Sequence, residues 1–443
     1  MRRVLHFVFL PGIASLVLAL GVVHSHLGDR PYRFGTQNSI AAYLALGALH
    51  WLTAHTAGLP DEAEDMQPAF GAALIASAIA TGSWLLVQTV FPGLLPRWVI
   101  LAAAGIVPVF TFALGAFSVL GRRRQRRRDR VLAVLSPEDA ETLLLDASTS
   151  FPLPEVAFSL VDTIATDSGR LEALTDIAGE CGATLVVLSE SAARLDDVYR
   201  AAATLHRSGV AVATLTDFYA QHFGKLPVAE LSRMALLFDV RDQLHPAYRH
   251  TKRTIDTVGA LVGVFICVLT IPFILVGNVV ANRGPLIYRQ KRVGRNGVIF
   301  TIMKFRTMRP DLTGADSPAN LSWTRPDDPR ITPFGRVLRR THLDELPQAL
   351  SILRGELSIV GPRPEQPHYV DELRSKEPAY DLRHLVTPGL TGWAQIKYRY
   401  AATDAAAMEK LQYDLFYISR QSLTLDLRIL SRTIRSVLRR RGR

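Results

Sequence analysis

Two adjacent acids, Asp344 and Glu345, lie in the segment "THLDELPQ" (341–348), within a strongly basic part of the chain. A carboxylate can attack phosphorus and form an acyl phosphate, which divides one group transfer into two easier steps. A second carboxylate can hold Mg²⁺, which bridges phosphate oxygens and neutralises charge as a leaving group departs. Because neighbouring helical residues point about 100° apart, the two acids suit separate roles rather than a shared proton. The residue types alone leave open which acid has which role.

An anionic nucleophile that approaches a diphosphate is repelled unless positive side chains surround it. The chain supplies four candidates for phosphate contacts: Lys304 and Arg306 in "KFRTM", Arg339 just before the acids, and Arg363 in "GPRPE". Arginine suits this role because its planar guanidinium donates two parallel hydrogen bonds to phosphate. Contact with water or lipid headgroups is the alternative for every arginine, and we favour it for Arg336, Arg340 and Arg354.

The first 121 residues predict four transmembrane helices. The apolar segments are Val4–Val23, Ser39–Trp51, Ala69–Val90 and Trp98–Leu120. Three of them reach the roughly 20 residues that cross a bilayer, whereas the second is weakened by His50 and His55. A signal peptide is the alternative for the first segment, but no small-residue cleavage site followed by a polar chain is apparent.

Seven arginines in "GRRRQRRRDR" (121–130) follow the fourth apolar segment directly. Basic residues beside a membrane helix remain in the cytoplasm, so we expect the N-terminus and the acidic loop Asp61–Asp65 on the same side. The net charge of +11 favours anionic lipids or phosphorylated small molecules as partners. Membrane helices, together with the lack of interleaved aromatic and basic residues, argue against nucleic acid. With only Cys181 and Cys267, a disulfide framework or a cysteine-rich metal site is not expected.

Residues 130–240 predict a Rossmann-like α/β domain. Four short apolar runs read as buried strands, at 131–135, 156–161, 184–189 and 210–215. Helical patterns alternate with them, the first capped by Ser136 with Asp139 three residues on, which indicates a parallel sheet with helices on its faces. No glycine occurs between Gly121 and Gly169, so the first strand-to-helix turn lacks the loop that cradles a dinucleotide phosphate. A structural or regulatory role is therefore favoured.

A fifth apolar run, Val258–Ala281, contains no charged residue. Pro272 near its middle is expected to kink the helix, and the Thr270 hydroxyl could bind a freed carbonyl oxygen. Basic residues flank both ends of the run, and a straight crossing would place one basic cluster on the wrong side. The pattern favours a re-entrant helix at 258–281 that enters and leaves from the cytoplasm, with a single crossing as the open alternative.

Residues 248–443 carry several long motifs in a fixed order: "GPLIYRQKRVGRNG", "KFRTM", "THLDELPQ", "GPRPE" and "TPGLTGWAQI". This arrangement resembles the bacterial polyprenyl-phosphate phosphoglycosyltransferases, or sugar-1-phosphate transferases, of the large monotopic type. The resemblance implies a mainly helical catalytic domain and a bacterial cytoplasmic (inner) membrane location facing the cytoplasm. It implies transfer of a sugar 1-phosphate from a UDP-sugar to polyprenyl (undecaprenyl) phosphate, with release of UMP. The product would initiate exopolysaccharide, capsule or O-antigen type glycan synthesis.

The same resemblance assigns the nucleophile to Asp344, through a covalent phosphoglycosyl-aspartate, and Mg²⁺ binding to Glu345. It favours Arg339 and Arg363 as the phosphate contacts. It also points to Gln395, beside a tight loop expected at "TPGLTG" (387–392), although a plain structural turn fits that loop equally well.

The sequence leaves several alternatives open. The amphipathic tail from Asp404 to Arg443 fits helices lying in the membrane interface or helices packed in a core. A non-catalytic membrane scaffold or regulator of polysaccharide assembly is the alternative function, but a scaffold does not need an acid pair surrounded by cations. The identity of the sugar and the formation of a homo-oligomer are left undecided.

Overall fold

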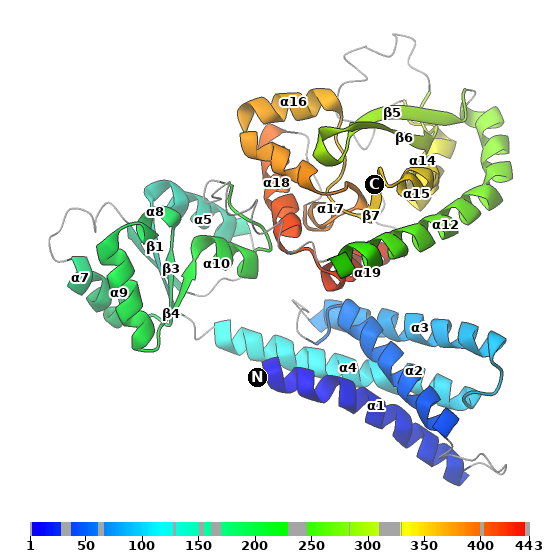
Figure 1. The fold of residues 1–443 in the computed structure, drawn as a ribbon, viewed down its shortest axis with the longest axis horizontal. Helices are drawn as coiled ribbons and strands as arrows, with labels where there is room; N and C mark the ends of the chain where they lie inside the picture. Colours follow the sequence, from blue (N-terminus) through cyan, green and yellow to red (C-terminus); the bar gives the residue numbers. More distant parts are fainter. Residues whose placement is uncertain are drawn as a thin grey trace. The chain divides into compact units, whose positions relative to one another are not determined.

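The computed structural model describes residues 2–27, 37–60, 66–126, 130–149, 155–160, 170–228, 246–282, 284–309, 328, 330–398 and 403–438. The chain divides into two compact units. The first contains Met1–Leu132 with two short later segments, and the second contains Val186–Arg443 with two short earlier ones. Figure 1 shows the elements in chain order.

Four helices begin the chain, as the apolar segments predict: α1 (Arg2–Leu27), α2 (Gln37–Thr56), α3 (Met66–Val90) and α4 (Arg97–Arg126). Helices α1, α3 and α4 each contain a stretch that is long and apolar enough to cross a membrane. Among the described residues, α2 contains no such stretch. This agrees with the weaker prediction for the second segment. The side chains of the arginine run and the loop Asp61–Asp65 lie outside the described residues.

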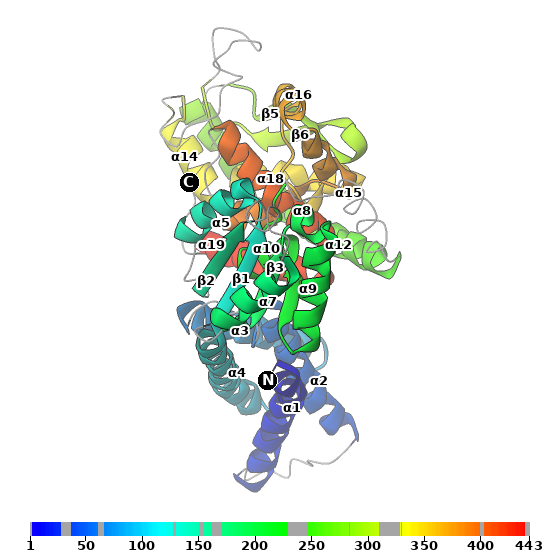
Figure 2. The same ribbon diagram turned by 90° about the vertical axis from the view of Figure 1, so that its left-hand side faces the viewer.

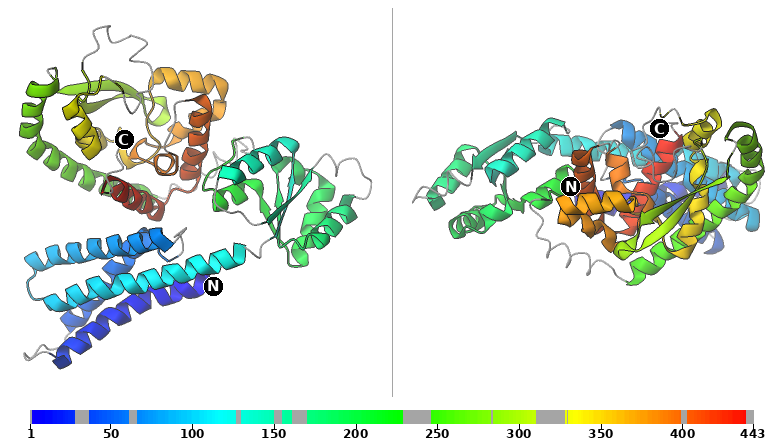
Figure 3. Two further views of the ribbon diagram at one scale, coloured as in Figure 1. Left: turned by 180° about the vertical axis from the view of Figure 1, so that it is seen from behind. Right: turned by 90° about the horizontal axis from the view of Figure 1, so that it is seen from above.

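The helical bundle is apolar on its outside as well as in its core. Phe9, Ile13 and Tyr43 are fully buried between the helices, while Leu86 and Leu101 remain 70% and 66% exposed. Large apolar side chains facing outward are unfavourable in water and favourable in lipid. Figure 3 shows α1, α3 and α4 running side by side. The helices of the N-terminal third are therefore suited to a membrane.

The four strands predicted between residues 130 and 240 are present and form one sheet. They are β1 (Arg130–Leu135), β2 (Glu155–Leu160), β3 (Leu185–Leu188) and β4 (Ala211–Thr214), in the sheet order β2-β1-β3-β4 (Figure 2). The helices of the domain are α5 (Pro137–Thr149), α7 (Arg170–Glu180), α8 (Glu190–Ala193), α9 (Asp196–Arg207) and α10 (Leu215–His222).

Hydrogen bonds between β1 and β3 confirm a parallel pairing. The Thr184 N–H donates to the Arg130 carbonyl at 2.9 Å, and the Ser189 N–H donates to the Val134 carbonyl at 3.1 Å. Both partners thus advance in the same direction along the chain. The predicted cap of α5 is also present, since Ser136 Oγ accepts from the Asp139 N–H at 3.2 Å and donates to its carboxylate at 2.6 Å.

The C-terminal half is mainly helical, with two small sheets. Its helices are α12 (Pro246–Gly277), the π-helical turn η1 (Asn278–Asn282), the 3₁₀ turns η2 (Arg295–Gly297), η3 (Leu343–Gln348) and η4 (Pro378–Leu385), α14 (Pro333–Thr341), α15 (Ala349–Arg354), α16 (Pro367–Lys376), α17 (Trp393–Lys397), α18 (Asp404–Ser419) and α19 (Leu423–Leu438). Strands β5 (Ile287–Val293) and β6 (Ile299–Phe305) form an antiparallel hairpin, and β7 (Ser358–Val360) pairs in parallel with β8 (Gly389–Thr391).

Helix α12 continues through Pro272 without interruption of its assignment, and its ribbon changes direction toward the C-terminal end in Figures 1 and 3. The Thr270 hydroxyl binds the Ile266 and Cys267 carbonyls, each at 3.0 Å. It does not reach the Val268 carbonyl, which Pro272 leaves without its helical donor. Most apolar side chains of the helix face outward, as in the N-terminal bundle.

The segment "TPGLTG" differs from the predicted tight loop, because Gly389–Thr391 forms strand β8. Its glycines serve close approach of two backbones. A Cβ added at Gly389 would lie 2.0 Å from the Gly361 nitrogen, and one added at Gly392 would lie 2.3 Å from the Gly361 carbonyl oxygen. Both distances are far below van der Waals contact, so only glycine fits where the two backbones approach each other.

The tail packs in a core rather than presenting its leucines outward. Leu411, Leu415 and Ile418 of α18 and Ile429 of α19 are at most 1% exposed, in one cluster with Val360 and Trp393. Of the two alternatives for the tail, the packed-core one is correct for these side chains.

The close backbone approach between Gly361, which follows β7, and Gly389 of β8 predicts that Gly389→Ala and Gly361→Ala destabilise the C-terminal half. Overpacking against an immobile backbone typically costs about 1–3 kcal/mol, which lowers the melting temperature by several degrees in a domain of this size. Thermal unfolding in detergent would measure it. Gly179→Ala, where no atom lies within 4 Å of the added Cβ, is the control. An unchanged melting temperature in both Gly389→Ala and Gly361→Ala would contradict the packing argument.

Candidate active site

The acid pair lies at a sharp change of backbone direction. Helix α14 ends at Thr341, and the next residue, His342, adopts the left-handed conformation with φ 56° and ψ 15°. The 3₁₀ turn η3 then begins at Leu343 and carries both acids, with Pro347 in its last turn before α15. The left-handed residue was missed, although histidine tolerates this conformation better than most residues.

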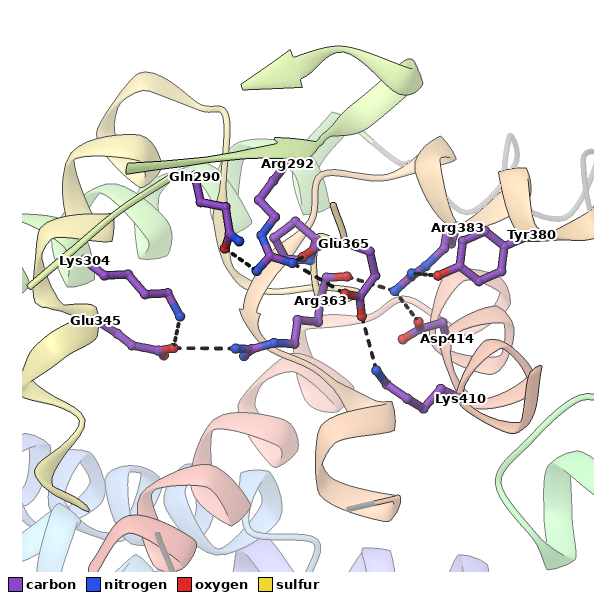
Figure 4. Close-up of polar contacts among 11 residues, drawn as sticks. Gln290, Arg292, Lys304, Glu345, Arg363, Glu365, Tyr380, Arg383, Lys410 and Asp414 are labelled. Atoms are coloured by element: carbon purple, nitrogen blue, oxygen red, sulfur yellow. Dashed lines mark hydrogen bonds and ion pairs between the residues drawn. The ribbon is translucent and has the colours of Figure 1, made fainter. Parts of the chain in front are cut away.

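Glu345 is held by two cations from distant segments. Its Oε1 lies 2.8 Å from Lys304 Nζ of β6 and 3.6 Å from Arg363 Nη2, which follows β7 (Figure 4). Burial alone would raise the pKa of the Glu345 carboxyl group, but Lys304 and Arg363 outweigh burial and lower that pKa to about 2. Glu345 is therefore ionised at neutral pH.

Asp344 is in a different state. Its side chain is 8% exposed, and no ion pair or hydrogen bond holds its carboxylate within the described part of the chain. Burial and the negative charge of Glu345 raise the pKa of Asp344 to about 6, against the opposing charges of Lys304 and Arg339. The residue types did not distinguish the two acids, whereas their surroundings do. Glu345 is held by two cations, and Asp344 has no ion-pair or hydrogen-bond partner for its carboxylate among the described residues.

Arg339 approaches the acids from α14. Its Nε donates to Thr307 Oγ1 at 3.0 Å, and its charge acts on the Asp344 carboxylate. Thr307 follows Arg306, so the "KFRTM" motif orients the arginine through its threonine. The sequence reasoning did not single out Thr307.

The remaining candidates lie apart from this arrangement. Arg306 Nε donates to the Pro285 carbonyl at 2.7 Å. Gln395 Nε2 lies 3.5 Å from the Leu390 carbonyl, and its Oε1 is buried with no partner among the described residues. Roles for both in substrate binding stay predictions. The side chains of Arg336, Arg340 and Arg354 are exposed, as expected for solvated arginines.

A buried ionic network behind Arg363 escaped the sequence reasoning. Arg383 Nη2 donates to the Arg363 carbonyl at 2.8 Å and to Asp414 at 2.9 Å. Glu365 lies 3.2 Å from Lys410 and 3.5 Å from Arg292, and Figure 4 shows these groups around the backbone that carries Arg363. The network fixes that backbone while leaving the Arg363 side chain directed at Glu345. Residues so far apart in sequence give no local signal.

The acidic side chains of the site fit a magnesium ion that is coordinated partly by the protein and partly by phosphate oxygens of a substrate. No group of three or more histidine, cysteine or acidic side chains gathers in the residues that the structure describes. Mg²⁺ does not require such a cage, because it commonly binds one or two carboxylates and completes its shell with phosphate oxygens and water. Glu345, ionised and beside Asp344, offers that kind of donor.

With this geometry in place, the chain can be compared with known proteins. Residues 247–440 match the family described as bacterial sugar transferase. An exopolysaccharide production protein from Rhizobium leguminosarum bv. phaseoli is 36% identical over 200 residues, which are 43% of this chain and 96% of the relative. The chain belongs to the bacterial sugar transferase family. The resemblance drawn from the motifs is confirmed.

Two other relatives are longer. The UDP-N-acetylgalactosamine-undecaprenyl-phosphate N-acetylgalactosaminephosphotransferase of Aeromonas hydrophila is 37% identical over 44% of this chain and 45% of its own length. The UDP-glucose:undecaprenyl-phosphate glucose-1-phosphate transferase of Xanthomonas campestris pv. campestris is 38% identical over 49% of this chain and 44% of its own length. The matched region thus spans less than half of each of these two relatives.

The raised pKa of Asp344 predicts a dependence of stability on pH. Between the ordinary value of 3.8 and about 6, the folded protein binds a proton that the unfolded chain has lost, so stability falls as pH rises through this window. Asp344→Asn removes the ionisable group. At pH 7.5 the variant should be more stable than wild type, by about 1–3 kcal/mol in the free energy of unfolding. Near pH 4 the variant and wild type should be equally stable. Thermal unfolding at both pH values would measure the difference.

Glu345→Gln is the matched comparison. It removes the partner of a mostly buried lysine and should melt lower than wild type at pH 7.5. If the melting temperatures of Asp344→Asn and Glu345→Gln both rise or both fall at that pH, it is wrong that ionisation of Asp344 destabilises the fold while ionised Glu345 stabilises it.

Proposed function

We propose that the protein transfers a sugar 1-phosphate from a UDP-sugar to polyprenyl (undecaprenyl) phosphate, releasing UMP. The observation that carries this proposal is the unpaired, buried Asp344 beside a glutamate fixed by Lys304 and Arg363. Family membership supports it, as do the activities named for the relatives from Aeromonas and Xanthomonas. The lipid-linked sugar would start a surface glycan such as exopolysaccharide, capsule or O-antigen.

The reaction proceeds in two displacements. An oxygen of the Asp344 carboxylate attacks the phosphorus that carries the sugar, a P–O bond forms to Asp344, and the diphosphate bridge breaks so that UMP leaves with the bridging oxygen. A phosphate oxygen of the polyprenyl phosphate then attacks the same phosphorus and releases the Asp344 carboxylate. The aspartate suits the first step because its carboxylate is unpaired and its pKa of about 6 leaves it ionised at neutral pH.

The positive side chains bind the phosphates and screen their charge from the nucleophile. Lys304 and Arg363 already converge on Glu345, and Arg339 approaches Asp344 from α14. Arg306 and Gln395 are proposed as further substrate contacts. Glu345 would hold Mg²⁺, which would supply charge neutralisation at the diphosphate.

We propose that α12 is a re-entrant helix. Near its beginning, Lys252 Nζ donates to the Val360 carbonyl at 3.0 Å and Arg253 Nη1 to the Ile352 carbonyl at 2.6 Å. Beyond its end, Asn282 Nδ2 donates to the Arg306 carbonyl at 2.7 Å. Both ends therefore attach to the same polar catalytic region, which cannot occupy both sides of a bilayer. Between them, Phe265 and Leu269, each 64% exposed, suit lipid.

This arrangement supports a location at the bacterial inner membrane, with the catalytic segment on the cytoplasmic face beside anionic lipids. The soluble UDP-sugar and the phosphate of the membrane-bound acceptor would meet at the headgroup layer. For the Rossmann-like domain we propose a structural or regulatory role. Lys225, which follows α10, lies 2.5 Å from Asp146 of α5 and 3.6 Å from Glu409 of α18, and thus links the domain to the catalytic helices.

Asp344→Asn should abolish Mg²⁺-dependent UMP release across a panel of UDP-linked glucose, galactose and N-acetylated sugars. With the active UDP-sugar and no acceptor, wild type should gain the mass of one sugar phosphate on the peptide that holds Asp344. Arg363→Ala should lose about 10²-fold in rate, as for removal of one charge-stabilising donor. Arg336→Ala, at an exposed arginine, is the control. Normal turnover by Asp344→Asn would refute the proposal. If the wild-type protein releases no UMP with any of these UDP-sugars, a scaffold would be favoured instead.

Topology can be tested with single cysteines. In a background in which Cys181 and Cys267 are replaced by alanine, Arg249→Cys and Arg289→Cys place thiols at exposed sites. The first site lies in the first turn of α12, before its apolar stretch, and the second lies in β5, after that stretch. A re-entrant helix predicts that a membrane-impermeant maleimide labels both from the cytoplasmic side of oriented vesicles. Labelling from opposite sides would establish a single crossing instead.

A further inference from the structure

A buried polar turn ends the apolar helix α12. The turn η1 contains Asn278 and Asn282, whose side chains are 8% and 3% exposed. Buried amides need hydrogen-bond partners, and the partners show what the residue connects. The two asparagines connect different things. Asn278 Nδ2 donates to the Gly284 carbonyl at 2.7 Å, which closes the turn on itself.

Asn282 joins two other segments of the catalytic region. Its Nδ2 donates to the Arg306 carbonyl at 2.7 Å, and its Oδ1 accepts a hydrogen bond from the Thr332 hydroxyl. The amide therefore uses both of its ends, one toward the residue that follows β6 and the other toward the residue that precedes α14. A side chain with this pattern fixes the separation of three backbone segments.

Thr332 passes this constraint to α14. The same hydroxyl caps the helix by accepting from the Gly335 N–H at 2.9 Å. The first turn of α14 lies close against the backbone that follows β6, because a Cβ on Gly335 would lie 1.9 Å from the Thr307 carbonyl oxygen. The last turn of α12 contacts the same place, since a Cβ on Gly277 would lie 2.1 Å from the Phe334 ring.

Helix α14 is only nine residues long and leads directly to the reacting group. It carries Arg339, whose Nε binds Thr307 Oγ1 at 3.0 Å. It ends at the left-handed residue His342, which sets the direction of η3 and therefore of Asp344. The position of the nucleophile thus depends on how the start of α14 is attached to the end of the membrane helix.

We propose that Asn282 is a positioning residue for Asp344, tying the end of α12 to the cap of α14 so that the carboxylate is held in line with the sugar-linked phosphorus. The inference rests on the proposed function. It assigns Asn282 no contact with substrate and no role in proton transfer.

Asn282→Ala tests it through the first half-reaction. Mixing enzyme with UDP-sugar and Mg²⁺, without acceptor, should give a burst of UMP whose amplitude counts folded sites and whose rate reports attack by Asp344. Misplacement of a reacting group by about 1 Å can cost about 10²-fold in rate. We expect the burst rate of Asn282→Ala to fall about 10- to 100-fold with full amplitude, and KM for the UDP-sugar to stay within about 3-fold of wild type.

Matched variants separate positioning from folding. Asn278→Ala removes the other buried amide of the same turn and should keep a burst rate within about 3-fold of wild type. Thr332→Ser retains both hydrogen bonds and should behave as wild type. Thr332→Asp keeps a capping acceptor but cannot donate to Asn282 when ionised, and should show the slow burst of Asn282→Ala.

The outcomes divide clearly. A normal burst rate in Asn282→Ala overturns the proposal, and so does a reduced amplitude at normal rate, which would indicate a purely structural residue. Equal slowing by Asn278→Ala would mean that only the integrity of the turn matters, and would also overturn it. If wild type turns over with acceptor but gives no burst, the covalent step fails and the positioning of Asp344 by Asn282 fails with it, while the transfer of the sugar phosphate stands. If wild type releases no UMP at all, the proposed function fails and this inference fails with it.

Discussion

The ion pairs of Glu345 with Lys304 and Arg363 set the electrostatics of the whole site. A buried carboxylate without partners would be protonated, but the two cations keep Glu345 ionised. The resulting fixed negative charge, together with burial, raises the pKa of the neighbouring Asp344. One interaction therefore produces two unlike acids from adjacent residues. The pair resembles other active sites in which environment, not residue type, assigns the chemical roles.

That interaction depends on how Arg363 is presented. The strand before it, β7, pairs in parallel with β8, and next to this pairing the Gly361 and Gly389 backbones approach more closely than any side chain allows. The backbone carbonyl of Arg363 is held by Arg383, which is itself paired with Asp414. The arginine that meets Glu345 is thus anchored from behind by a second set of buried charges. Burying so many charges is unfavourable unless each is paired, which the network achieves.

The membrane helix and the catalytic region meet through polar contacts at both ends of α12. Its middle exposes large apolar side chains, whereas Lys252 before them and Asn282 after them bind backbone carbonyls of the catalytic region. In the proposed reaction this division has a function. The apolar part holds the protein at the depth of the acceptor phosphate, and the polar ends transmit that position to the residues that react.

The amino-acid sequence by itself determined the helices of the N-terminal third, the strands of the α/β domain and the location of the acid pair. Apolar runs and period-2 or period-3.6 patterns are local properties, so they survive without knowledge of the fold. It also supplied the four candidate cations, because phosphate chemistry requires them. It did not separate the roles of Asp344 and Glu345, and it predicted a loop where β8 forms.

Only the tertiary structure shows which of the two acids is paired with cations and where β8 forms. Lys304 precedes Glu345 by 41 residues, and β7 and β8 belong to segments that are likewise separated in the chain. Whether a carboxylate is paired, and whether a glycine segment becomes a strand, depends on which distant backbone arrives beside it. The tail shows the same limit, since its leucine pattern fitted both a membrane interface and a core until the burial of Leu415 and Ile418 decided between them. Periodicity reports that a face will be covered, but the covering partner is a property of the fold.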